Sequence, residues 1–156
     1  MTKFDVSRNK LYAAGCEAVA AALDGNQVIT ELNISSNSMG WIDGNHEGTS
    51  GVVAIANAIK DMGALSLANV MGNRIGKDML SKLQEIMRSK PKLISLCGIA
   101  DDATEADLSG LQMDADDAII LASELPDKGA MTSLNLASNR LRVEGAKIIA
   151  AIPKCT

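Results

Sequence analysis

An asparagine set in a fixed apolar frame recurs along the chain, and this recurrence constrains the fold more than any other feature. A fixed period of about 20 to 50 residues predicts a stack of similar structural units. A fifth copy of the frame keeps the apolar positions but has Leu111 in place of the asparagine. The five copies are Phe4-x-Val6-x-x-Asn9-x-Leu11, Leu32-x-Ile34-x-x-Asn37-x-Met39, Ala68-x-Val70-x-x-Asn73-x-Ile75, Ala106-x-Leu108-x-x-Leu111-x-Met113 and Leu134-x-Leu136-x-x-Asn139-x-Leu141.

The spacing between anchor positions shows where the units are regular. From Asn9 through Asn37, Asn73 and Leu111 to Asn139 the steps are 28, 36, 38 and 28 residues. The outer steps share one period, so the inner steps carry insertions of 8 and 10 residues. We expect one domain over residues 1–156, with insertions at about 40–50 and 93–103.

The second half of each unit has apolar residues at helical spacing. Gly15, Val19 and Leu23 follow one another every four residues, and Gly51, Ile55 and Ile59 repeat the pattern. This spacing places each set on one face of a helix. Each unit is therefore predicted to run strand, turn, helix and return, which gives an α/β fold.

These patterns resemble a known repeat class. The frame L-x-x-L-x-L-x-x-N-x-L, followed by G-x-x-x-(L/I/V) and a 28-residue step, is similar to the ribonuclease-inhibitor class of leucine-rich repeats over nearly the whole chain. The resemblance implies a leucine-rich-repeat solenoid, a right-handed α/β horseshoe with a curved parallel sheet and one helix in each of about five repeats. The sequence departs from the class at Leu111, at Met79 in place of the helix-opening glycine, and at Ala68 and Ala106 in place of leucine.

The composition limits which residues can form the core and which kinds of partner are expected. With one Phe, one Trp and one Tyr, the core must be built from aliphatic side chains. The formal charge of -4 argues against nucleic acid, because phosphate binding needs a dominant basic surface. We expect no membrane insertion, because no segment approaches 18 uninterrupted apolar residues. Cys16, Cys97 and Cys155 are odd in number and far apart, which favours reduced thiols in the cytoplasm.

Enzymatic chemistry is not predicted. The single histidine lacks the His-Cys or His-Glu spacing of a zinc site. The segment Gly72–Asp78 imitates a phosphate-binding loop, but it is one residue short and has Asp78 where Ser or Thr is needed. The acids between Asp101 and Asp117 lack calcium-loop spacing, so we expect them to be solvated or to sit at helix starts. We predict no enzyme, no cofactor and no metal.

Two surfaces are candidates for binding a protein. The concave face should carry a row of Asx residues, which either contact a partner or bond to one another along the sheet. The positions after the anchors form a rim with three cations, which either contact an acidic partner or form a solvated edge. The row is Asp5, Asn33, Asn69, Asp107 and Asn135, and the rim is Lys10, Ser38, Arg74, Gln112 and Arg140. The anchor asparagines themselves should turn inward and bond to the backbone.

The insertions differ in character. The first holds Trp41 and His46 among glycines and reads as a loop, with Trp41 either an interface anchor or a lid on the core. The second, with the apolar run Leu93–Ile99, should pack as an extra extended segment. The candidate partner-binding residues are then Lys10, Trp41, His46, Asn69, Arg74, Asn135 and Arg140.

The resulting prediction is a scaffold for protein–protein interaction, bound along the concave face or the rim. Alternatives are a GTPase-activating regulator of a small GTPase, using Asn73, Arg74, Asn139 and Arg140, or a fragment of a larger receptor-type repeat protein. The repeat class supports both roles, so the fold does not choose between them. No polar cap is recognisable at either end, which makes end-to-end self-association an expectation.

Overall fold

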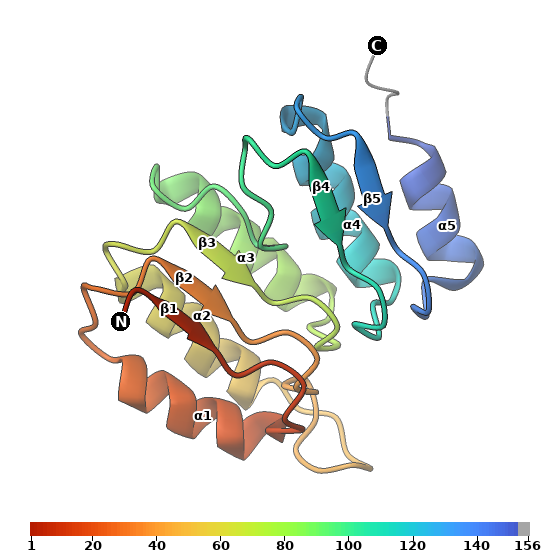
Figure 1. The fold of residues 1–156 in the computed structure, drawn as a ribbon. Helices are drawn as coiled ribbons and strands as arrows, with labels where there is room; N and C mark the ends of the chain where they lie inside the picture. The colour runs from red at the N-terminus through yellow and green to blue at the C-terminus, as the bar shows by residue number, and fades with distance from the viewer. Residues whose placement is uncertain (153–156) are drawn as a thin grey trace.

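The computed structural model describes residues 1–152 and consists of five strand–helix units. In Figure 1 the strands lie on one side of the molecule and the helices on the other, which confirms the predicted α/β unit. A short 3-10 turn, η1, follows α4. In chain order the elements are β1 (Lys3–Asp5), α1 (Tyr12–Leu23), β2 (Glu31–Asn33), α2 (Ser50–Asp61), β3 (Leu67–Asn69), α3 (Lys77–Ser89), β4 (Glu105–Asp107), α4 (Ala115–Glu124), η1 (Leu125–Asp127), β5 (Ser133–Asn135) and α5 (Arg142–Ala150).

The strands form two small parallel sheets instead of the one continuous curved sheet that we expected. The first sheet has the order β1-β2-β3 and the second pairs β4 with β5. The register places Asp5 opposite Asn33 and Asn33 opposite Asn69, and it places Asp107 opposite Asn135. The predicted Asx alignment is therefore confirmed within each sheet and interrupted between β3 and β4.

The second insertion causes this interruption. The Ile94 N–H donates to the Ser66 carbonyl at 2.9 Å, and the Ala68 N–H donates to the Ser95 carbonyl at 2.9 Å. The Val70 N–H completes the set with a 3.0 Å bond to the Leu96 carbonyl. An extended segment of the insertion thus takes the edge of β3 that β4 would otherwise use. Its apolar composition predicted that it would pack as an extra extended segment, but not that it would take this edge.

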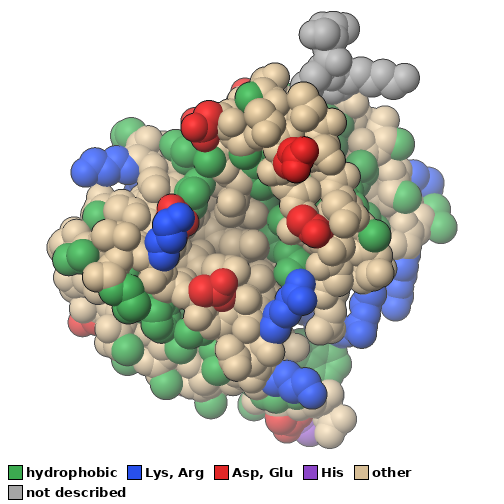
Figure 2. Space-filling view, in the orientation of Figure 1, with side chains coloured by type: hydrophobic (Ala, Val, Ile, Leu, Met, Phe, Trp, Pro, Cys, Tyr) green, Lys and Arg blue, Asp and Glu red, His purple; other side chains and the backbone are tan. Residues whose placement is uncertain are grey.

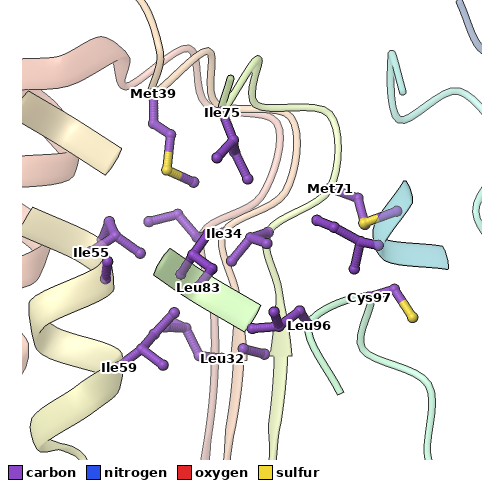
Figure 3. Close-up of a cluster of buried hydrophobic side chains, with 14 of the residues drawn as sticks. Leu32, Ile34, Met39, Ile55, Ile59, Met71, Ile75, Leu83, Leu96 and Cys97 are labelled. Atoms are coloured by element: carbon purple, nitrogen blue, oxygen red, sulfur yellow. The ribbon is translucent and has the colours of Figure 1, made fainter. Parts of the chain in front are cut away.

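The core is aliphatic and lies between the strands and the helices. Figure 3 shows Leu32 and Ile34 of β2 and its following turn pointing toward Ile55 and Ile59 of α2. All four side chains are buried, and Leu96 of the insertion joins the same cluster. Burial of such side chains contributes about 1.5 to 3 kcal/mol each, so the core needs no aromatic centre.

The anchor asparagines act as the predicted backbone links between units. The Asn73 side-chain amide donates to the carbonyls of Ile34 (2.9 Å) and Val70 (2.8 Å). Its Oδ1 accepts the backbone N–H of Asn37 at 2.8 Å. The Asn37 Oδ1 accepts the N–H of Asn9 in the same way, also at 2.8 Å. Each amide satisfies buried peptide groups in two successive turns, which explains why the pattern needs asparagine.

A buried carboxylate replaces this link where the asparagine is missing. One Asp117 oxygen accepts the Gly72 N–H at 3.0 Å, and the other accepts the Asp114 N–H at 2.9 Å. Burial raises the pKa of Asp117 to about 7. Asp114, Asp116 and Asp117 lie at the start of α4, which confirms the helix-start expectation, but Asp117 is buried and not solvated. Asp117 thus joins the start of α4 to the turn after β3.

Glu124 forms a second polar link, between α4 and the insertion. Its carboxylate accepts the Leu96 N–H (2.7 Å), the Ser95 hydroxyl (2.7 Å) and the Cys97 thiol (2.8 Å). All of these groups are buried, and burial raises the pKa of the Cys97 thiol well above its ordinary value. The apolar segment is thus held in place by side-chain chemistry as well as by its pairing with β3.

Two further expectations concerned the state of the cysteines and membrane insertion. Cys16 and Cys97 are buried and carry no disulfide, whereas Cys155 lies outside the described residues. Within residues 1–152 no helix combines the length and apolar character required to cross a membrane.

Candidate partner-binding rim

The backbone turns at the carboxyl ends of the strands position the rim. The residue after the anchor has a left-handed conformation in four units: Lys10, Ser38, Arg74 and Gln112 have φ values of 53°, 58°, 53° and 64°. This conformation costs a non-glycine residue about 1 kcal/mol or more. The amides of Asn37 and Asn73 turn inward and hold their turns in place, so the next side chain is displayed at the rim. Asn9 also bonds to backbone carbonyls but is exposed, so the prediction that it turns inward is wrong.

Trp41 and Arg74 meet on this rim. The Arg74 guanidinium lies over the Trp41 ring, 4.7 Å from its centroid. The loop is held by the backbone N–H of Trp41, which donates to the Ser38 carbonyl at 3.0 Å, and by the Trp41 carbonyl, which accepts the Ala13 N–H at 2.8 Å. Trp41 is half-buried and Arg74 is exposed. The Trp41 indole packs against one face of the Arg74 guanidinium, and the charged group stays exposed to solvent.

Two grooves flank Arg74. One has a volume of about 340 Å³ and lies between the Trp41 loop and the start of α4. The other has a volume of about 390 Å³ and extends to the start of α5. Both grooves include Asp114 and Asp116, so Arg74 stands between them with acids on one wall. We call this surface the rim groove and define it by Trp41, Arg74, Asp114, Asp116, Arg140 and Arg142.

The rim groove carries both charge signs in close alternation. Burial, followed by the neighbouring Asp114 charge, raises the pKa of Asp116, while Lys77 opposes the shift. Arg140 and Arg142 bring positive charge to the far end of the groove, and Glu144 lies beside them. The groove can therefore accept an acidic group at its arginines and a donor group at its acids.

The predicted site residues do not form one site. The structure brings Trp41, Arg74 and Arg140 to the rim groove, whereas Lys10 and His46 line neither of its grooves. His46 instead contacts Asp43 at 3.0 Å on the exposed loop. Sequence reasoning missed Asp114, Asp116 and Arg142 as groove residues. Their signal was their position just beyond the rim, at the starts of the fourth and fifth helices.

Asn69 and Asn135 belong to the strand face, shown in Figure 2. That face is hollowed near its middle, with acidic and basic side chains around a floor of backbone and uncharged side chains. Asn69 lines a depression of about 240 Å³ over the first sheet, and Asn135 does not line it. Within the row, the Asn33 amide donates to Asp5 at 2.9 Å. This contact fits the expectation that the Asx side chains bond along the sheet.

Comparison with known proteins bears on the last unit. A family model described as "Leucine Rich repeat" matches residues 131–150, which contain β5 and α5. A search of curated proteins found no match. The family match supports a leucine-rich-repeat protein, a class of domain that generally mediates protein–protein interaction.

Proposed function

We propose that the chain is a protein-interaction module that binds its partner through the rim groove. The observation that carries the proposal is the Trp41–Arg74 stack at 4.7 Å, placed between two grooves. Trp and Arg are the residues most enriched among binding hot spots, particularly where neighbouring groups shield them from water. The leucine-rich-repeat match supports the same class of function.

The charges of the rim groove suggest what the partner offers. A carboxylate fits between Arg74 and Arg140, which line one groove together. An apolar or planar group fits against Trp41 in the other groove, beside Gly40 and Gly48. A segment with an acidic side chain near an apolar one meets both requirements.

The finer description of the fold is part of the proposal. We propose a ribonuclease-inhibitor-like solenoid over residues 1–156 as one domain, supported by parallel pairing within each sheet and by the repeated asparagine links. We also propose a non-enzymatic scaffold in the cytoplasm, where buried thiols such as Cys16 and Cys97 stay reduced.

The GTPase-regulator alternative gains no specific support. Asn73, one of its candidate residues, is fully buried, and its amide is bonded to backbone groups. Arg74 is stacked on Trp41. That alternative stays a prediction, testable by the rate of GTP hydrolysis of Ras-like GTPases mixed with this chain.

The test compares rim variants for partner capture and affinity. Partners are captured from the source cell with the unaltered chain, then titrated against Trp41→Ala and Arg74→Glu by calorimetry. Loss of a central anchor should weaken binding by about 2 kcal/mol, or roughly thirtyfold. Lys10→Glu is the matched control, because Lys10 is an exposed rim cation outside both grooves. Unchanged affinity in both test variants, with folding verified by circular dichroism, would refute the rim groove as the binding site.

A further inference from the structure

Within residues 1–152 no element covers the outer face of α5, which carries small apolar residues beside the exposed Lys147. Val143 is 67% exposed, and Ala146 and Ala150 beside it are also exposed. The repeat register aligns Gly145 of α5 with Gly15 of α1, so the corresponding α1 residues are Ala13, Cys16 and Ala20. Those three are only 3%, 0% and 9% exposed, and α1 packs against α2. The same helical face is therefore covered in the first unit, whereas in the last unit no described residue covers it.

The flank of α1 that faces away from α2 has the complementary form. Gly15 and Ala22 on this flank correspond to Gly51 and Ala58 of α2, which α2 presents to α1. A Cβ atom at Gly51 would lie 2.7 Å from the Ala13 Cα, so glycine permits this close approach. Ala58 is 8% exposed, whereas Ala22 is exposed. The flank of α1 thus has the small residues that such packing needs, without a partner within residues 1–152.

The free edges of the two sheets match in the same sense. Within the first sheet, Ile34 N–H donates to the Asn69 carbonyl at 3.0 Å and Ser36 N–H donates to the Met71 carbonyl at 2.9 Å. The equivalent donors in the last unit are the N–H groups of Leu136 and Ser138, which have no acceptor among the described residues. At the other end, β1 presents the equivalent carbonyls of Asp5 and Ser7 on the edge that pairs with no strand within residues 1–152. The Ser7 carbonyl also accepts the Asn9 side-chain amide at 3.0 Å, as the Met71 carbonyl accepts the Asn73 amide besides the Ser36 N–H.

The hydrogen bond from one anchor asparagine to the next has free groups at both ends of the described chain. Asn37 N–H donates to Asn73 Oδ1 at 2.8 Å, so the link runs from one unit to the next. Asn139 N–H has no acceptor in the part of the chain that the structure describes, and Asn9 Oδ1 accepts no hydrogen bond there. Asn9 is therefore the acceptor that a unit placed before it would use.

We propose that the β5–α5 end of one copy binds the β1–α1 end of a second copy, which extends the second sheet with a parallel strand. A second copy fits because it brings the helix flank, the strand carbonyls and the free asparagine oxygen together in one register. The contact reproduces the packing between α1 and α2 within the chain. Because its two surfaces differ, the contact is heterologous and leads to rings or open chains of molecules in place of a closed twofold dimer.

The experiment uses one charged variant at each end. Val143→Glu blocks the α5 face, and Ala22→Glu blocks the α1 flank, while Val53→Glu, at a 38% exposed position on α2, is the matched control. Sedimentation equilibrium over a hundredfold concentration range should show an average mass that rises at least about twofold for the unaltered chain and the control. Each blocked variant alone should remain monomeric.

Mixing the two blocked variants tests the polarity of the contact. Ala22→Glu retains an intact α5 end and Val143→Glu an intact α1 end, so an equimolar mixture should form dimers and nothing larger. A symmetric contact between two α5 ends would instead let Ala22→Glu dimerise alone, which overturns the proposal. A monomeric unaltered chain at every concentration also overturns it. Partner capture through the rim groove should be unchanged in Ala22→Glu, so the two proposals fail independently.

Discussion

The first two units and the last two units of the molecule are built on one plan. Asp5, Asn33 and Asn37 lie 102 positions before Asp107, Asn135 and Asn139. The two strand pairs have equivalent hydrogen bonds. Thr30 N–H donates to the Thr2 carbonyl at 2.7 Å, and Thr132 N–H donates to the Thr104 carbonyl at 2.7 Å. The same apolar and Asx frame therefore yields the same local geometry in both regions.

The two regions differ where each meets the centre of the molecule. Leu111 stands where the first region has Asn9, and Asp117 stands where it has the helix-opening Gly15. The amide link is lost, and a carboxylate six residues later reaches the Gly72 N–H instead. The comparison teaches that the strand frame tolerates replacement of a polar anchor when a nearby side chain satisfies peptide groups at the same junction.

The largest contrast should come from removing one anchor in each region. In the first region, Asn37 is fully buried and bonded on both sides of its amide, so Asn37→Ala leaves several peptide groups without partners. We expect a loss of about 3 to 4 kcal/mol in the free energy of unfolding, against about 1 to 2 kcal/mol for the half-buried Asn139→Ala. Urea denaturation measures both. Equal losses would show that the two regions depend equally on their anchors.

A matched glycine pair tests the junction next. Gly72 and Gly110 both precede an anchor position and have φ values of +71° and +63°. A Cβ at Gly72 would meet the Leu111 carbonyl oxygen, whereas a Cβ at Gly110 meets nothing within 4 Å. Gly72→Ala should cost about 3 kcal/mol and Gly110→Ala about 1 kcal/mol, because only the first adds a clash to the left-handed strain. Thermal unfolding would reveal any reversal of this order.

The pH dependence of stability isolates Asp117. Its folded pKa is raised to about 7 from 3.8, so the folded state holds this proton over a pH range in which the unfolded chain releases it. Stability from this group is complete below pH 3.8 and falls as pH rises toward 7, by about 1.4 kcal/mol per pH unit. Asp117→Asn should remove about 2 kcal/mol of the decline between pH 5 and pH 6.5. An unchanged profile in denaturation at several pH values would contradict the buried-acid assignment.

The smallest effect should come from the exposed contact across the hollow. Arg8 Nη2 donates to the Ser109 carbonyl at 3.2 Å and joins the first unit to the fourth. Because the contact is exposed, Arg8→Ala should change the free energy of unfolding by at most about 0.5 kcal/mol. A loss comparable with that of Asn139→Ala would show that the two regions support each other across the hollow.

The sequence predicted the units but not how they join. Strand register followed from the alignment of Asp5, Asn33 and Asn69, because a parallel pairing that aligns the frame leaves one arrangement. The break between the sheets was not predicted, although the insertion that fills it was expected to be extended. Pairing of Ser95 and Leu96 with β3 depends on contacts between segments about 30 residues apart, which periodicity does not report.

Part of the candidate site was also predictable. The positions after the anchors identified Arg74 and Arg140, and the glycine-rich insertion identified Trp41 as a loop residue. Their meeting could not be predicted, because it depends on how the loop folds back onto Ala13. Asp117 and Glu124 were missed for a related reason: an acid at a helix start or end is normally solvated, and only the neighbouring unit buries them.

The contacts of Glu124 with Ser95, Leu96 and Cys97 make the reactivity of Cys97 a measure of whether the inserted segment is in place. Its thiol is 1% exposed, is hydrogen-bonded to Glu124, and has a pKa raised by burial, so an alkylating reagent should not modify it in the closed molecule. Modification then requires the inserted segment to leave its place between the sheets. Cys16, 0% exposed and with its pKa raised to about 11, provides an internal reference in the first unit. In a Cys155→Ser background, the ratio of the two labelling rates would time the opening of the junction separately from the unfolding of the first unit.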